Sequence, residues 1–231
     1  MIVRVYEALL EYHPLKRPYV LQPLLASAMP KVSRDGLTYT FKIRSNVKFH
    51  DDAAFPAGKG RTLVAEDFVY SLKRLADPKT NANGWWLLEN RLVGLDEWRA
   101  ESQKAATTNY ATSIEGLKAL DASTLQIKLK KPYPQFLSAL SLPYASAVPH
   151  EAVDKYGKEF INHAVGTGPF VLESFKPNEV VTFVKNPNYW SATYPTEGAT
   201  GDKEKGLLED AGKSLPFLDR IESRIIVEDQ P

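Results

Sequence analysis

The alternation of apolar and polar residues predicts that much of this chain forms β-strands. Residues 38–44 alternate large apolar side chains with charged or hydroxyl side chains, which is the period of a half-buried strand. The Asp-Gly pair at residues 35–36 is a turn signal, so we expect a hairpin with an earlier strand at residues 26–32. The same reasoning predicts strands at residues 47–49, 117–120, 125–129, 170–175, 180–185 and 221–227, the middle four paired as two hairpins.

Apolar residues at steps of three and four predict the helices. Ala65, Phe68, Leu72 and Leu75 form one apolar stripe, and the Asp-Pro pair at residues 77–78 ends this helix. Shorter helices are expected at residues 96–106, 134–140 and 149–157, and Trp85–Leu88 forms either a short helix or a buried loop. This mixture of helices and strands predicts a mixed α/β fold.

The length and composition support that class. A chain of 231 residues is long enough for a packed core in one or two domains. Its 16 prolines and 11% aromatic residues indicate a loop-rich fold with large side chains to bury. The longest apolar runs are too short to span a membrane, and we recognise no secretory signal segment at the beginning of the chain.

Charge and cysteine content exclude several kinds of site. The chain has 29 basic and 28 acidic side chains, so its formal net charge is +1. Without a basic excess, no nucleic-acid partner is expected. The absence of cysteine excludes disulfides, thiolate metal sites and a cysteine nucleophile, although it does not decide the compartment.

The residues that could carry catalysis or metal binding all have a simpler structural explanation. His50, Asp51 and Asp52 could hold a cation, but a turn at a strand end is the favoured interpretation. Residues 166–169, Gly-Thr-Gly-Pro, lack the Lys-Ser/Thr of a phosphate loop, which favours a tight turn. The four histidines do not pair at helical metal-ligand spacing, and no Gly-x-Ser-x-Gly motif occurs. We therefore predict no catalytic residue, no metal and no cofactor.

Aromatic residues are the remaining candidates for ligand contact. Trp85, Trp86, Trp98, Tyr189 and Trp190 could together form a recognition surface. In a globular fold taken by itself, core filling is the favoured interpretation of such residues.

Four sequence blocks stand out along the chain. They are Leu25-Ala26-Ser27-Ala28-Met29 with residues 35–44 and 47–51, then residues 65–74, 165–170 and 186–190. Together they resemble the extracellular solute-binding proteins of family 5, the peptide- and nickel-binding receptors of ABC importers. Each block alone is a weak signal, but four in the family's order cover nearly the whole chain. The chain departs from the family pattern at Met29, Asp52 and Val64, where a Trp, a Gly and a Thr are usual, and these departures affect local turns.

The resemblance implies a periplasmic-binding-protein type II-like fold. This chain would be an incomplete first lobe (lobe I) with two subdomains. Residues 7–147 would form the smaller subdomain, and residues 148–231 part of the main subdomain, with residues 1–6 as its leading segment. Family members are longer and contain a second lobe (lobe II) that this chain lacks. We expect unpaired sheet edges in residues 148–231, to which another chain could add a strand.

The resemblance also implies a function. A receptor of this family would capture a small solute, by default an oligopeptide or dipeptide, between its two lobes and deliver it to a membrane permease. Nickel chelates, haem and oligosaccharides remain open as ligands. The location would be periplasmic or extracellular, with membrane association through the transporter. No bond is made or broken in such a cycle, so we do not expect an enzyme.

For the ligand-facing wall, the resemblance points to two pairs of residues. Trp85 and Trp86 lie in the segment where relatives place an aromatic side chain beside the bound peptide, and core filling is equally favoured for them. Thr167 and Gly168 form a turn whose backbone groups are expected to face the cleft, although a structural role is favoured for the glycine. Two alternatives stay open: a secreted hydrolase using surface carboxylates, and a binding-protein fold repurposed for signalling or chaperoning.

Overall fold

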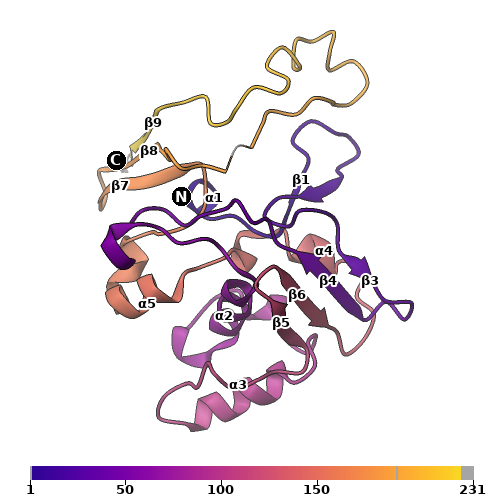
Figure 1. Cartoon of the computed structure of the whole chain (residues 1–231), viewed down its shortest axis with the longest axis vertical. Coiled ribbons are helices and arrows are strands. Elements are labelled where there is room, and N and C mark those ends of the chain that lie inside the picture. Colours follow the sequence, from indigo (N-terminus) through magenta and orange to yellow (C-terminus); the bar gives the residue numbers. More distant parts are fainter. Residues whose placement is uncertain (1, 191, 225–231) are drawn as a thin grey trace, which may run out of the picture.

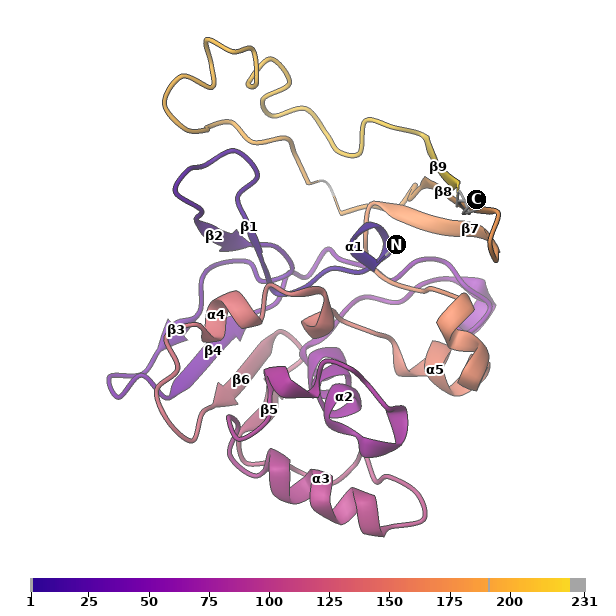
Figure 2. The ribbon, with the colours of Figure 1, turned by 180° about the vertical axis from the view of Figure 1, so that it is seen from behind.

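The helices and strands are arranged in two parts along the long axis of the molecule (Figure 1). The computed structural model describes residues 2–190 and 192–224. One part contains a four-stranded sheet with helices packed on it, and the other contains a three-stranded sheet with a long loop beyond it. The view from behind shows the same arrangement (Figure 2). The expected mixed α/β class is confirmed.

The four-stranded sheet is antiparallel, with the order β3-β4-β6-β5. Its register places Phe41 opposite Leu125 and Tyr39 opposite Ile127, and all four side chains are buried. The two hairpins predicted from alternation in this region are confirmed. Their residues alternate because one face of the sheet is covered and the other faces water. The strands are β3 (Lys31–Val32), β4 (Thr38–Lys42), β5 (Leu117–Asp121) and β6 (Thr124–Lys128).

Helix α2 (Ala65–Ala76) covers the buried face of this sheet through β5 and β6. Its predicted stripe is buried, with Phe68 and Leu72 at 0% and 1% exposure. Burial of each large apolar side chain stabilises the fold by about 1.5–3 kcal/mol before entropy is subtracted. Val64 offers no side-chain cap; instead the Asp67 carboxylate accepts the backbone N–H of Val64 at 2.8 Å.

Helix α3 (Leu95–Lys104) packs against α2 and was expected to be exposed. Three of its residues depart from that expectation, because Leu95, Trp98 and Ser102 are buried. Trp98 also donates its indole N–H to the carbonyl of Asn109. A short helix or a buried loop was expected at Trp85–Leu88, and the structure shows a short helix, a single 3-10 turn at Trp85–Leu87. This turn leads directly into two buried leucines, Leu87 and Leu88, which anchor it on the core.

The three-stranded sheet consists of β7 (Phe170–Lys176), β8 (Val180–Lys185) and β9 (Arg220–Arg224) in that order. The predicted hairpin β7–β8 is confirmed, with Asn178 at φ 60 in its turn. The last strand is confirmed from residue 220 to 224, and the rest of its predicted range lies outside the described residues. Within the described chain β9 pairs with β8 alone, which leaves its other edge open, as expected.

The remaining elements are short. The expected helix at 134–140 is reduced to four residues, and the expected helix at 149–157 begins at His150 because Pro149 occupies its N-cap position. Gly157 follows its last residue at φ 52, where glycine avoids the strain of a Cβ. These elements are α1 (Ile2–Val5), β1 (Leu10–Tyr12), β2 (Leu21–Pro23), α4 (Phe136–Ala139) and α5 (His150–Tyr156).

Residues 47–49 do not form the separate strand that alternation predicted. Only Lys48 makes an isolated bridge, with Thr62. The N–H of Phe49 bonds to the carbonyl of Arg61, but the next N–H, of His50, bonds to the carbonyl of Gly166. The segment therefore lies between two neighbouring segments, and its pairing with residues 61–63 is limited to one bridge, too short for a continuous ladder.

The two parts contain separate hydrophobic clusters. The larger one fills the space between the four-stranded sheet and α2, and the smaller one consists of Val5, Phe170, Val181 and Phe183. Tyr6 packs against both clusters and so connects them. In the described part of the chain, the helices are too short or too polar to cross a membrane.

Candidate functional site

A pocket of about 640 Å³ opens where α2, the segment after it and the segment after α5 meet. Its wall comes from the last turn of α2, residues 79–84, residues 143–148 and residues 157–164. These segments lie side by side in both ribbon views (Figures 1 and 2). The volume lies within the usual range for sites that bind small molecules.

One side of the pocket is apolar and rich in aromatic rings. Phe160 and Leu75 form the buried part of this wall, while Ile161 and Tyr144 are exposed at its edge. The Trp86 ring lies edge-on to the Tyr144 ring, with centroids 6.2 Å apart, and is 51% exposed. Such exposed, adjoining aromatic rings are typical of surfaces that contact a ligand or another protein surface.

A glycine makes room for this aromatic pair. A Cβ built on Gly84 would lie 2.7 Å from a ring carbon of Tyr144 and 2.7 Å from a methyl carbon of Leu75. A side chain at residue 84 would therefore push the Tyr144 ring away from the wall. Gly84 thus controls the shape of the pocket without contacting its centre.

The charged residues that line the pocket in the described chain are all basic: Arg74, Lys79 and Lys158. The Arg74 guanidinium lies over the Phe160 ring, 5.6 Å from its centroid, within the reach of about 6 Å for a cation–π contact. Lys79 donates from Nζ to the carbonyl of Ser102, which holds that side chain in place. The potential in the pocket is therefore positive.

The structure separates the two tryptophans that the sequence grouped together. Trp85 is half-buried beneath the Arg99 guanidinium, which lies 4.7 Å from its ring centroid, and it packs on the main core. Trp86 is directed to the surface beside Tyr144. Ligand contact by Trp86 remains a prediction that fits its exposure, whereas the contacts of Trp85 are those of a supporting residue.

Thr167 and Gly168 are enclosed by the protein itself. Thr167 is 0% exposed and donates its hydroxyl to Glu7 at 2.8 Å. The carbonyl of Gly168 lies 2.9 Å from Nε2 of His50, and its N–H donates to the carbonyl of Val5. Their proposed role as ligand contacts stays a prediction, and every contact described here is structural.

Glu7 organises a buried polar cluster that sequence reasoning missed. Its carboxylate accepts hydrogen bonds from Thr167, from Tyr189 at 2.7 Å and from the Trp190 indole at 3.2 Å. Burial raises the pKa of Glu7 to about 7, although those three donors act in the opposite direction. The only signal in the sequence was a lone acid within the apolar opening segment, residues 5–10.

The three residues His50, Asp51 and Asp52 each bond to a different partner. His50 is buried, and burial lowers its pKa to about 4, so its ring is neutral at pH 7. Asp51 pairs with Lys59 at 2.8 Å, and Asp52 accepts from His163 at 2.7 Å. Within residues 2–190 and 192–224, no group of three or more His, Asp and Glu residues lies closely enough together to hold a metal ion.

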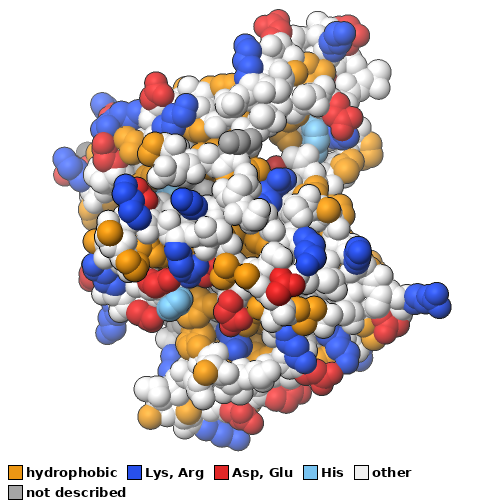
Figure 3. Space-filling model, in the orientation of Figure 1, with side chains coloured by type: hydrophobic (Ala, Val, Ile, Leu, Met, Phe, Trp, Pro, Cys, Tyr) orange, Lys and Arg blue, Asp and Glu red, His pale blue; other side chains and the backbone are white. Residues whose placement is uncertain are grey.

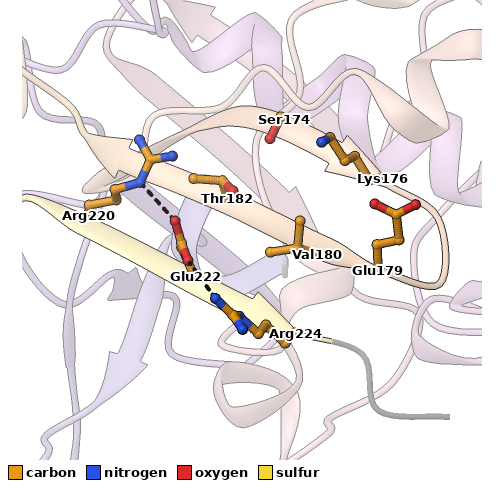
Figure 4. Close-up of a pocket in the computed structure, with 8 residues that line it drawn as sticks. All are labelled: Ser174, Lys176, Glu179, Val180, Thr182, Arg220, Glu222 and Arg224. Atoms are coloured by element: carbon orange, nitrogen blue, oxygen red, sulfur yellow. Dashed lines mark hydrogen bonds and ion pairs between the residues drawn. The ribbon is translucent and has the colours of Figure 1, made fainter.

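A second hollow lies on the outer face of the three-stranded sheet (Figure 4). Glu222 lies between Arg220 and Arg224 on β9, at 3.2 Å and 4.0 Å from them, so these charged side chains of the hollow pair with one another. The face of the molecule seen in Figure 3 carries basic and acidic side chains interspersed. Paired charges on an open sheet are typical of a solvated surface, so the pocket beside α2 remains the stronger candidate.

The fold is of the mixed α/β type and carries a pocket of small-molecule size beside α2. Residues 20–231 match the model of the bacterial extracellular solute-binding proteins, family 5 Middle. The chain belongs to this family, and the resemblance noted from its four sequence blocks is confirmed.

Individual relatives agree with that assignment. The chain is similar to the periplasmic oligopeptide-binding protein OppA of Salmonella typhimurium, with 33% identity over 161 residues, 68% of this chain and 27% of that protein. It is 37% identical over 166 residues to the oligopeptide-binding protein AmiA of Streptococcus pneumoniae, covering 69% of this chain and 23% of that protein.

A solved structure shows the same fold. The crystal structure of a periplasmic oligopeptide-binding protein of an oligopeptide ABC transporter from Borrelia burgdorferi superimposes with a TM-score of 0.73 and 26% identity. The superposition covers 97% of this chain and 38% of that one. The matched part of the chain thus spans only 23% to 38% of the length of these proteins.

Proposed function

We propose that this chain is part of the solute-binding component of an ABC importer, and that the solute is a peptide. The observation that carries the proposal is the aromatic pocket beside α2, on a fold whose relatives bear the name of oligopeptide-binding proteins. Aromatic rings and nearby backbone groups suit a peptide, since they contact it without changing it.

The chain would supply one lobe of a two-lobed clamp. Residues 7–147 would form its smaller subdomain, and residues 148–231 with the leading residues 1–6 would belong to the main subdomain. The two hydrophobic clusters support this division, because one lies mainly in each segment. Lobe II of the same protein would close over the pocket, since the bound peptide contacts the closed form better than the open one.

The remaining partner would be the membrane permease of the importer. The receptor would act outside the cytoplasm, as the family's description as extracellular suggests, and would approach the membrane through the transporter. Because transport leaves the peptide intact, the polar clusters at Glu7 and His50 would support the fold and take no part in chemistry.

Calorimetric titration of peptides tests this function. We expect short peptides to bind the protein that carries this chain, and Trp86→Ala to weaken their binding by about 5- to 30-fold, since a buried aromatic contact contributes roughly 1–2 kcal/mol. Tyr19→Ala is the matched control, because Tyr19 is an exposed aromatic residue outside the pocket. The proposal fails if a broad peptide library produces no heat of binding and no thermal shift.

A further inference from the structure

The pocket beside α2 contains a cation that the described protein does not neutralise. Arg74 is half-buried in the last turn of α2. Among the described residues, its guanidinium makes no ion pair and donates no hydrogen bond; its described contact is the ring of Phe160. The positive charge of Arg74 interacts favourably with the negative end of the α2 dipole, which explains in part why a cation lies there. That interaction leaves the five N–H donors of the guanidinium free.

Arg61, next to the other end of α2, is an arginine whose donors are used within the fold. Its guanidinium donates to both carboxylate oxygens of Asp67, at 2.9 Å and 2.6 Å, and to Glu151 at 2.5 Å. Arg99 likewise donates to the carbonyl of Ala76. Arg74 differs from both because it lines a cavity and its guanidinium donates to no acceptor among the described residues.

Neighbouring groups make the pocket more favourable for an anion. Lys79 and Lys158 come from two other segments of the wall, and Lys158 has no ion pair in the described chain. The nearest acid along the chain, Asp77, is buried and accepts instead from the hydroxyls of Thr108 and Tyr110 at 3.0 Å and 2.8 Å. Three cations from three segments thus face one cavity that no described carboxylate lines.

We propose that this pocket binds a carboxylate group of the solute, with Arg74 as the residue that recognises it. A guanidinium binds a carboxylate through two parallel hydrogen bonds, and partial removal of water strengthens them. Lys79 and Lys158 add attraction at the pocket mouth, and the Trp86–Tyr144 pair contacts the adjoining part of the peptide. This inference rests on the proposed function and specifies the chemistry of its ligand.

The test compares matched peptides on the protein that carries this chain. One set of tetra-alanine peptides carries a single Glu at each position in turn, a second carries Gln there, and a third is amidated at the C-terminus. We expect one position, or the free C-terminus, to improve affinity at least tenfold over its neutral counterpart. Comparison of the Glu scan with the amidated set identifies which carboxylate is bound. The preference should shrink as salt concentration rises.

Variants locate the effect. Arg74→Gln should reduce the preference to less than twofold while the affinity for neutral peptides is retained, and Arg74→Lys should keep part of it. Arg34→Gln is the matched control, since Arg34 is exposed in the β3–β4 turn. The double variant Lys79→Gln/Lys158→Gln changes only exposed side chains and should lower the preference even if Arg74→Gln does not fold.

Each result has a distinct meaning. Equal binding of acidic and neutral peptides overturns the carboxylate inference but leaves peptide binding intact. A uniform loss of affinity for all peptides in Arg74→Gln shows a structural arginine and also overturns it. Failure of every peptide to bind contradicts the proposed function itself.

Discussion

Glu7 places an acidic group inside the protein among three donors from two separate segments. Thr167, Tyr189 and Trp190 each direct a hydrogen atom to its carboxylate. Three donors compensate for much of the lost hydration, yet burial still raises the pKa of Glu7 to about 7. The cluster thus holds together two of the family's sequence blocks, residues 165–170 and 186–190. Its stability depends on the protonation state of Glu7.

The stability of the protein should depend on pH through Glu7. Its pKa rises from 4.5 in the unfolded chain to about 7 in the folded one. The stabilisation is complete below pH 4.5 and is lost as pH rises towards 7, because the unfolded state releases its proton first. The loss amounts to about 3 kcal/mol over that window. Urea unfolding at pH 5 and pH 8 measures it.

Glu7→Gln isolates this contribution. The variant should show a pH slope that differs from that of the parent by the amount above, while Glu115→Gln, at an exposed site, should not. His50 acts in the opposite direction, since its pKa is lowered to about 4 and stability falls as pH drops from 6.5. The difference between variant and parent removes the effect of His50, and equal slopes in both proteins would contradict the prediction.

Helix α2 is the element on which both the core and the pocket depend. Its apolar stripe covers the four-stranded sheet, and its last turn carries Arg74 into the pocket. Its first turn is held by Asp67, whose carboxylate accepts from the N–H of Val64 and from Arg61. One buried carboxylate therefore replaces the side-chain cap that Val64 lacks.

Asp67→Ala should destabilise the protein by about 2 kcal/mol, since a buried partner of Arg61 and of the helix N-terminus is removed. The Arg61 side chain is 30% exposed and keeps its pair with Glu151, which limits the loss. Glu66→Ala, next to it and exposed, should change stability by less than about 0.5 kcal/mol. Thermal unfolding compares them, and similar losses for both would argue against the capping role.

Prediction from sequence succeeded where an element is determined by its own residues. The hairpin β5–β6 and the helix α2 have a strict apolar period and a nearby turn or stop, so their burial pattern is visible locally. The prediction of a strand at residues 47–49 failed for the opposite reason. Its backbone partners, residues 61–63 and 166, come from two distant segments, and no local pattern shows how far the pairing with either of them extends.

At the scale of the whole molecule, the opening segment joins the two parts. Tyr6 contacts both hydrophobic clusters, and the turn at residues 166–168 packs directly on the backbone of residues 4–5. The Gly-Thr-Gly-Pro motif was expected to allow a close backbone approach, and this is confirmed by the contact of Gly166 with Val5. The join is therefore tight and leaves no space for a side chain.

Gly166→Ala tests that join. A Cβ on Gly166 would lie 2.0 Å from the carbonyl oxygen of Val5, so the backbone must shift, and we expect a loss above about 3 kcal/mol. Gly36→Ala is the control: nothing lies within 4 Å of its Cβ, and its φ of +71 should cost only about 1 kcal/mol. Chemical denaturation separates the two, and a loss at Gly166 no larger than at Gly36 would refute the close approach.

The sequence by itself determined the local elements and the family. Apolar periods, turn pairs and four motif blocks act over short distances along the chain, where neighbouring residues constrain one another directly. Only the tertiary structure decided which residues share a site. It divided Trp85 from Trp86, enclosed Thr167 around Glu7 and left Arg74 facing a pocket. Those contacts join segments that lie tens to more than a hundred residues apart, and their energies depend on burial, which no local pattern contains.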